Sequence, residues 1–210
     1  IKDVLASHDN GLVIHSGETS FPPISAGFVA NTIDGMFAVG NWPLDADREV
    51  FSCDNFGLRV FGGLPGDDWG YRYGDPSVLD VFCIKMADCD RNGTPDVVCL
   101  SDDPVPVVYY LNNPGGDIDW AENSDPSVQG QCFDAGDADR DADPDLMLGR
   151  EDSDNGVTYY SGDGGASWTN ATPSELPGLG TFSSVFLEDF DFDGFEDGFF
   201  VAKDAQGLHF

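Results

Sequence analysis

Three short stretches of the chain place acidic or amide side chains at every second position. They read ADCDRNGTPDVVCLS from residue 87, GDADRDADPDLMLGR from residue 136 and EDFDFDGFEDGFFVA from residue 188. Carboxylates this close repel one another, so a positive charge is needed to offset the repulsion. Clustered oxygen ligands are also what a hard cation such as calcium requires. The pattern therefore predicts three metal-binding loops.

We number nine positions in each loop from its first aspartate, so that the first, second and third acidic loops are residues 88–96, 137–145 and 189–197. The predicted ligands of one Ca²⁺ ion per loop are the side chains at positions one, three, five and nine and the backbone carbonyl at position seven. These residues are Asp88, Asp90, Asn92, Thr94 and Asp96 in the first loop, Asp137, Asp139, Asp141, Asp143 and Asp145 in the second, and Asp189, Asp191, Asp193, Phe195 and Asp197 in the third. Position six needs a residue that tolerates positive φ, which Gly93 and Gly194 supply, whereas Ala142 is expected to be strained there.

A weaker copy of the loop precedes these three, in the segment GNWPLDADREVFSC that begins at residue 40. Its candidate ligands are Asn41, Asp45, Asp47 and Glu49, but Pro43 removes one ligand position. This segment is either a fourth, weaker calcium site or a turn whose carboxylates face water. The solvated-turn interpretation also stays open for the three intact loops.

The competing calcium motif is the EF-hand, which requires flanking helices and a bidentate glutamate at position twelve. Position twelve is Cys99, Leu148 or Phe200 in the three loops, and the flanking segments resemble strands. An EF-hand is therefore excluded. Aspartate is much commoner than glutamate in the chain, which favours turns and cation ligands, although adaptation of the surface to salt remains an alternative.

The acidic loops are landmarks of a longer repeat. Their first aspartates recur about every 50 residues, as do the apolar segment before each loop and an aromatic residue after a later turn. Short segments rich in Val, Phe and Tyr indicate strands, and no stretch shows sustained helical periodicity. We therefore expect an all-β fold, a β-propeller whose four-stranded blades have about 50 residues each. A β-sandwich would not explain a period that runs through the chain.

The repeat divides the 210 residues into whole blades at 36–79, 80–129 and 130–179, with partial blades at 1–35 and 180–210. The chain would thus hold between four and five blades, beginning at the second strand of one blade and ending at the third strand of another. We expect it to be a single propeller or part of a larger one, completed by further blades of a longer chain or by another subunit.

The loops resemble the FG-GAP/VCBS repeat of integrin-α-type propellers, which reads D-x-D-x-D-G-x-x-D between the first two strands of a blade. The resemblance covers nearly the whole chain and is carried by the three intact loops. The segment SGDGGASW, residues 161–168, also resembles an Asp-box, a turn between the third and fourth strands of sialidase-type blades, with Ser167 where threonine is usual. This second resemblance implies a folding role for Ser161, Asp163 and Trp168.

Families with such repeats include adhesion receptors, fungal sugar-binding propellers, and the propellers of some polysaccharide lyases and phospholipases, so the fold alone does not decide the function. The sequence contains no nucleophile elbow, zinc-type histidine spacing or phosphate loop, and calcium accounts for most clustered carboxylates. We therefore expect a non-catalytic calcium-binding propeller that serves adhesion, recognition or scaffolding. The alternative is the propeller portion of a secreted enzyme that degrades polysaccharide or lipid.

The expected partner is a protein or carbohydrate that binds a propeller face. Exposed aromatic residues can stack on sugar rings, and the candidates are Trp42, Trp69, Tyr71, Tyr73 and Trp120. The segment WGYRYGD, residues 69–75, is the best candidate surface because it does not recur in the other repeats. Packing between blades is the alternative role for these aromatic residues, and it is favoured for Trp69, Trp120 and Trp168, which recur in register.

Composition limits the remaining possibilities. A net charge of −30 argues against nucleic acid as a partner. The sequence contains no run of about 18 apolar residues, so we expect no insertion into a membrane. Five cysteines without metal-type spacing define no disulfide framework, and Cys83 and Cys132 are either a pair or two buried thiols. Weak calcium sites need millimolar metal, so we expect an extracellular, cell-surface or periplasmic location.

Overall fold

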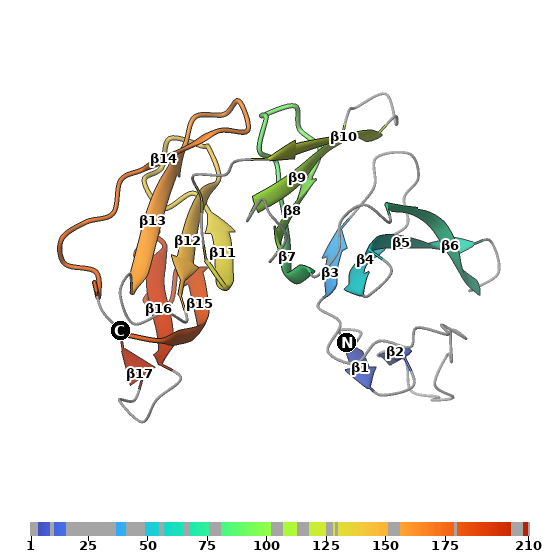
Figure 1. The fold of residues 1–210 in the computed structure, drawn as a ribbon, viewed down its shortest axis with the longest axis horizontal. Coiled ribbons are helices and arrows are strands. Elements are labelled where there is room, and N and C mark those ends of the chain that lie inside the picture. Colours follow the sequence, from blue (N-terminus) through green and yellow to red (C-terminus); the bar gives the residue numbers. More distant parts are fainter. Residues whose placement is uncertain are drawn as a thin grey trace.

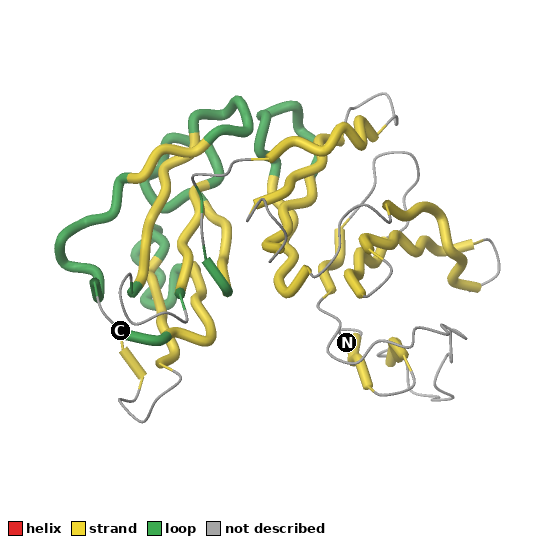
Figure 2. The backbone as a smooth tube through the Cα atoms, in the orientation of Figure 1, coloured by secondary structure: helices red, strands yellow, loops and turns green. Residues whose placement is uncertain are grey.

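The computed structural model describes residues 4–8, 11–15, 37–40, 49–54, 57–64, 68–75, 81–101, 107–112, 118–124, 128, 130–150, 156–178, 180–202 and 208–209. In these ranges the chain is all-β and contains no helix, as Figures 1 and 2 show. All strand pairs are antiparallel. The expected all-β class is confirmed. The described residues include no helix long and apolar enough to cross a membrane.

Three sheets have four strands each, which pair in chain order. The first contains β3 (Phe37–Gly40), β4 (Glu49–Asp54), β5 (Gly57–Leu64) and β6 (Asp68–Asp75). The second contains β7 (Val81–Ala87), β8 (Asp96–Ser101), β9 (Val107–Asn112) and β10 (Ile118–Ser124). The third contains β11 (Cys132–Gly136), β12 (Asp145–Gly149), β13 (Val157–Gly162) and β14 (Trp168–Asn170).

Two smaller sheets lie before and after these in the sequence. The strands β1 (Val4–His8) and β2 (Gly11–His15) form a two-stranded sheet. A three-stranded sheet contains β15 (Phe182–Glu188), β16 (Asp197–Ala202) and β17 (Leu208–His209). Chain-order pairing is the result of short antiparallel hairpins, which the turn-rich sequence between the strands favours.

The sheets stack through their first strands. Contacts join β3 to β7, β7 to β11 and β11 to β15, so each sheet lies against the next one along the chain (Figure 1). The second strands β8 and β12 are buried along their whole length, as expected for strands covered on both faces. The described part of the chain does not close the sheets into a ring, so the structure does not show a complete propeller or a blade number.

Apolar side chains fill the spaces between successive sheets. One cluster, which includes Val98, Leu100, Leu146 and Leu148, lies between the β7–β10 and β11–β14 sheets. A second joins the β3–β6 sheet to β7 and β8, and a third joins the β11–β14 sheet to β15 and β16. The core is thus divided into layers, one for each pair of neighbouring sheets.

A buried carboxylate adds polar contacts across three sheets. Asp134 on β11 is 9% exposed and forms an ion pair with Lys85 Nζ of β7 at 2.8 Å. Its Oδ2 atom also accepts a hydrogen bond from the Leu187 N–H of β15 at 3.1 Å. Asp134 therefore connects the first strands of three successive sheets.

The cysteines Cys83 and Cys132 are free and do not form the pair that the sequence left open; Cys83 is buried and Cys132 is partly buried. Each thiol lies at the interface with the next sheet. The Cys83 Sγ atom is 3.7 Å from the carbonyl oxygen of Phe133, and the Cys132 Sγ atom is 3.6 Å from that of Phe182. Burial raises the pKa of the Cys83 thiol, so it stays protonated and unreactive in the folded chain.

Candidate metal centres

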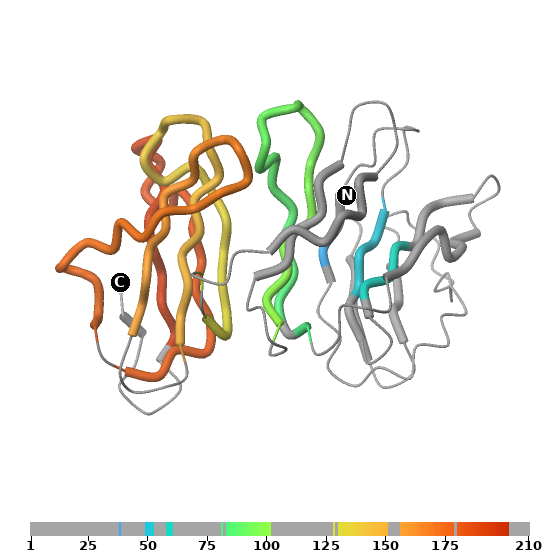
Figure 3. The backbone as a smooth tube through the Cα atoms, turned by 45° about the horizontal axis from the view of Figure 1, so that its top comes forward, coloured from blue at the N-terminus to red at the C-terminus, as the bar shows by residue number. Residues whose placement is uncertain are grey.

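Each acidic loop connects the first two strands of its sheet. The first loop joins β7 to β8, the second joins β11 to β12, and the third joins β15 to β16. Because the first strands of neighbouring sheets lie side by side, the loops come to the same end of the stack, where Figure 3 shows the first in green and the second in yellow. The repeat in sequence is therefore also a repeat in space.

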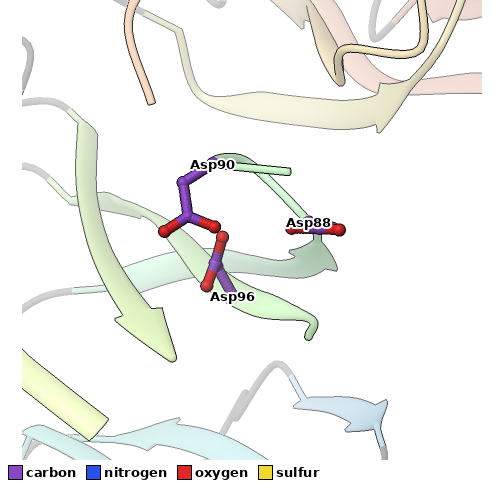
Figure 4. Close-up of side chains that lie close together, drawn as sticks. All are labelled: Asp88, Asp90 and Asp96. Atoms are coloured by element: carbon purple, nitrogen blue, oxygen red, sulfur yellow. The ribbon is translucent and has the colours of Figure 1, made fainter. Parts of the chain in front are cut away.

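In all three loops, the carboxylates at positions one, three and nine converge. One oxygen from each lies within 4.8 Å of the other two, in the groups Asp88, Asp90 and Asp96, Asp137, Asp139 and Asp145, and Asp189, Asp191 and Asp197. Figure 4 shows the first group, in which the carboxylates of Asp90 and Asp96 face each other. The structure therefore brings together three of the five predicted ligands in every loop.

Backbone hydrogen bonds hold the carboxylates in the same way in each loop. The N–H at position six donates to the position-one carboxylate, from Gly93 to Asp88 at 2.9 Å, from Ala142 to Asp137 at 3.1 Å and from Gly194 to Asp189 at 2.9 Å. The N–H at position two donates to the position-nine carboxylate, from Cys89 to Asp96 at 2.7 Å, from Ala138 to Asp145 at 2.9 Å and from Phe190 to Asp197 at 3.2 Å. The three acidic loops, although they differ in sequence, thus share one pattern of backbone hydrogen bonds.

The position-five carboxylates Asp141 and Asp193 are not members of the convergent groups, and the Asn92 amide donates to the group member Asp90 at 3.0 Å. The side-chain oxygens at position five accept a hydrogen bond from the N–H at position seven, at 2.8 Å in each loop, and the pairs are Asn92 with Thr94, Asp141 with Asp143, and Asp193 with Phe195. This contact forms a local turn that orients the position-seven peptide. Position five therefore supports the loop backbone in this structure.

Two positions in each loop have left-handed backbone conformations. Position six has φ of 86° at Gly93, 70° at Ala142 and 87° at Gly194, as the sequence predicts. Position four has φ of 57° at Arg91, 64° at Arg140 and 61° at Phe192, which the sequence analysis did not predict. Residues with a Cβ are strained in this region, so the surrounding hydrogen bonds must hold the loops in place.

The carboxylates at position nine of the first two loops are fully enclosed, because Asp96 and Asp145 are both 0% exposed. Asp145, in the second loop, has both backbone and side-chain donors. Besides the N–H of Ala138, it accepts hydrogen bonds from the Tyr159 hydroxyl at 2.8 Å and the Gly162 N–H at 2.9 Å. Burial raises the pKa of Asp145, and these two donors partly oppose the increase. The same carboxylate is thus both a structural acceptor and a candidate ligand.

Some carboxylate oxygens of the acidic loops lack a hydrogen-bond partner, and this bears on whether a cation fits there. The Oδ1 atoms of Asp137 and Asp189, both at position one, are buried and have no hydrogen-bond donor. A buried carboxylate oxygen without a partner is costly, and a cation would remove that cost. The groups contain only oxygen donors, which suits Ca²⁺ or Mg²⁺ better than zinc. The residues therefore fit a hard divalent cation.

Of the weaker first-repeat residues, Asn41, Asp45 and Asp47 lie outside the described residues. Glu49 begins β4 and is buried, with 2% exposure. The fourth calcium site thus stays a prediction.

The Asp-box-like turn packs against the acidic loops. Trp168 is 5% exposed, and its indole N–H donates to the carbonyl oxygen of Pro144 in the second loop at 3.0 Å. Asp163 accepts the Gly165 N–H at 2.9 Å, and Ser161 Oγ lies 3.3 Å from Asp139. These contacts agree with the expected folding role of the turn.

The arginines at position four are functional candidates that the sequence analysis missed. Arg91 Nη2 of the first loop donates to the backbone carbonyl of Asp141 in the second loop at 2.6 Å, and Arg91 Nε pairs with the Asp143 carboxylate. Arg140 of the second loop lies 3.3 Å from the ring centroid of Phe195 in the third. The available signal was the shared tetrapeptide D-x-D-R, which occurs in both loops.

Aromatic side chains are exposed around the third loop. Phe186 is 45% exposed, Phe190 47%, Phe192 90% and Phe195 51%. A cavity of about 650 Å³ lies beside this loop and is lined by Leu176, Pro177, Phe190, Phe199, Asp191 and Asp197, among others. The aromatic residues that the sequence predicts as a contact surface lie instead in the earlier repeats.

Those earlier candidates are only partly placed by the structure. Trp69, Tyr71 and Tyr73 belong to β6, and Trp120 belongs to β10, but their side chains are outside the described part of the chain. Trp42 lies outside the described residues altogether. The WGYRYGD surface therefore stays a prediction.

No protein-family model matches this chain, and no curated protein matches it. The resemblance to FG-GAP/VCBS repeats accordingly rests on the loop sequences, and the propeller stays a prediction.

Proposed function

We propose that the chain is a non-catalytic, calcium-binding propeller, or part of one, that acts outside the cell as an adhesion, recognition or scaffold module. The observation that carries this proposal is the threefold repetition of one acidic hairpin loop. Three carboxylates converge within 4.8 Å in each copy, on the same backbone scaffold. Chance clustering of surface aspartates does not account for the same geometry at three sites.

Calcium is favoured over other cations by the kind of ligand and by the loop. The convergent groups contain no nitrogen or sulfur donor, although Cys89 occupies position two of the first loop. The Cys89 thiol is buried and lies 3.6 Å from the Ala87 carbonyl, and burial raises its pKa far above the usual value. The convergent group of the first loop does not include Cys89, so the thiol is not placed as a zinc ligand. A loop whose aspartates provide several carboxylate oxygens suits the variable coordination of calcium better than the strict octahedron of magnesium.

The proposed partner is a protein or carbohydrate. The exposed phenylalanines around the third loop and the cavity of about 650 Å³ beside it support this choice, because aromatic side chains provide contact area for either class. In this proposal the calcium ions hold the loops, and the aromatic side chains provide the contact surface.

Calorimetric titration of the chelator-treated chain with calcium tests the proposal. We expect saturation at about three ions per chain, one for each convergent group. The variants Asp90→Ala, Asp139→Ala and Asp191→Ala each remove the position-three ligand of one loop, and each should lower the stoichiometry by about one ion. A Glu175→Ala variant serves as the control, since this exposed acidic residue belongs to none of the groups.

Binding of zinc in preference to calcium would contradict the assignment, as would an unchanged stoichiometry in all three variants. If the loops bound no divalent cation at millimolar concentration, the carboxylates would be solvated turns.

A further inference from the structure

The three acidic loops are joined to one another by the side chains at position four. Arg91 extends from the first loop to the second, where it contacts both the Asp141 carbonyl and the Asp143 carboxylate. Arg140 extends from the second loop to the Phe195 ring of the third. In each case the side chain contacts the loop that follows in sequence, so the contacts run in one direction through the stack.

The Arg91 contact is built into the fold by three elements. Asp143 is 3% exposed, so its carboxylate would be costly without the guanidinium beside it. The turn between β13 and β14 lies over the pair, and a Cβ at Gly164 would meet Asp143 Oδ1 at 2.5 Å and Arg91 Nε at 2.8 Å. The Ala166 N–H of the same turn donates to the Cys89 carbonyl of the first loop at 3.0 Å. The first loop, the second loop and this turn thus form one contact region.

The position of Arg91 depends on the conformation of its own loop. Arg91 has φ of 57°, and it lies between Asp90, a member of the convergent group, and Asn92, whose N–H donates to Asp88. An ion held by this group would stabilise the left-handed conformation at Arg91. The guanidinium would then be fixed against the Asp141 carbonyl before the second loop binds its own ion.

The charge of Arg91 is paired mainly with the buried carboxylate of Asp143. Asp143 contributes a backbone carbonyl and not its carboxylate to the predicted ligand set, so this ion pair uses no predicted side-chain ligand. Arg91 Nη2 also lies 3.9 Å from Oδ1 of Asp141, the predicted position-five ligand, so the guanidinium contacts the second loop at one ligand position as well. The convergent carboxylates Asp137, Asp139 and Asp145 are separate from this pair.

We propose that Arg91 is a positioning residue that couples the first two metal centres, so that an ion in the first acidic loop raises the calcium affinity of the second. This inference rests on the proposed calcium binding. It predicts that the two sites fill with positive cooperativity, and that the coupling is lost when the guanidinium is removed.

Calcium titration followed by NMR on the ¹⁵N-labelled chain can resolve the sites individually. The amides of Gly93, Ala142 and Gly194 each donate to the first carboxylate of their own loop, so each amide signal reports one site. We expect Asp90→Ala, which disables the first loop, to raise the calcium midpoint at Ala142 at least about fivefold. In an Arg91→Met background the same substitution should change that midpoint less than about twofold.

Two further variants make the test specific. Arg140→Met removes the arginine at the same position of the second loop, which points to the third, and should leave the fivefold effect at Ala142 intact. Arg91→Lys keeps the charge but lacks the guanidinium fork that reaches Asp141 and Asp143 together, so the coupling should again fall below about twofold. This variant also covers the case in which Arg91→Met does not fold.

The outcomes separate the two proposals. If none of the three amides responds to calcium, the calcium assignment is wrong and the coupling is wrong with it. If all three respond but Asp90→Ala leaves the Ala142 midpoint unchanged, or if the Arg91 variants retain the fivefold effect, calcium binding stands and the coupling through Arg91 is overturned.

Discussion

At the scale of single residues, the loops depend on backbone conformations that most side chains avoid. Positions four and six are both left-handed in every loop, but glycine occupies only position six of the first and third. Ala142 takes that conformation with φ of 70° because its N–H donates to Asp137. The second loop thus stores strain that the other two avoid at this position.

Replacing Ala142 with glycine should therefore stabilise the chain. Relief of the left-handed strain outweighs the extra entropy of glycine in the unfolded state, and we expect a gain of about 1 kcal/mol in the free energy of unfolding. Urea denaturation would measure it.

The matched control is Ala138→Gly in the same loop, where φ is not positive, and this variant should destabilise the chain. A loss of stability in Ala142→Gly would show that the conformation at position six is not strained.

At the scale of elements, the sheets contact one another mainly through their first strands. Apolar residues fill the layers between the sheets, while Asp134 connects β11 to β7 and β15. A carboxylate that is 9% exposed is tolerated there because it receives both an ammonium group and a backbone N–H. Its removal would affect two interfaces at once.

Asp134→Ala should lower the free energy of unfolding by about 2 kcal/mol, since it leaves the buried Leu187 N–H without its acceptor. Thermal or urea denaturation of the calcium-loaded chain provides the measurement. Lys85→Met should cost less than about 1 kcal/mol, because the lysine side chain is 37% exposed and its ion pair is screened by water. Equal losses in the two variants would contradict the assigned role of the Leu187 contact.

The sequence was sufficient to predict strands, antiparallel hairpins and the acidic loops, because each depends on local spacing. Positions one and three lie at the start of each loop and position nine at its end. The hairpin brings these two ends together, so the convergence of the three carboxylates follows from the hairpin itself. The contacts of Arg91 and Asp134 could not be predicted, since their partners lie about 50 residues away in neighbouring sheets, and only the stacking distance decides which side chains meet.

At the scale of the whole molecule, a net charge of −30 on 210 residues opposes compaction. Part of this charge lies in the three acidic loops, and Figure 3 shows their backbones at one end of the sheet stack. Three divalent ions would neutralise charge where the repulsion is strongest. Calcium should therefore act mainly as a folding ligand.

Chelation should consequently lower the Tm markedly in calorimetric scans. With free calcium at ten times Kd, each site contributes about 1.4 kcal/mol, and three sites contribute about 4 kcal/mol of a typical 5–15 kcal/mol. Asp191→Ala loses one exposed backbone hydrogen bond, from the Asp193 N–H, so in chelator it should lower the Tm less than Asp96→Ala and Asp145→Ala do. The carboxylates of Asp96 and Asp145 are fully buried, and their removal leaves buried backbone donors without an acceptor. An unchanged Tm in chelator, together with lost partner binding, would instead make calcium a bridging ligand.

The two interface thiols have a further consequence for how the molecule opens. Cys83 and Cys132 each lie against a carbonyl of the following sheet, at successive junctions of the stack. Cys83 is buried and Cys132 is partly buried, so an alkylating reagent should label each thiol faster when its junction is separated. The chain thus contains its own probes for asking whether the sheets separate one at a time or all together.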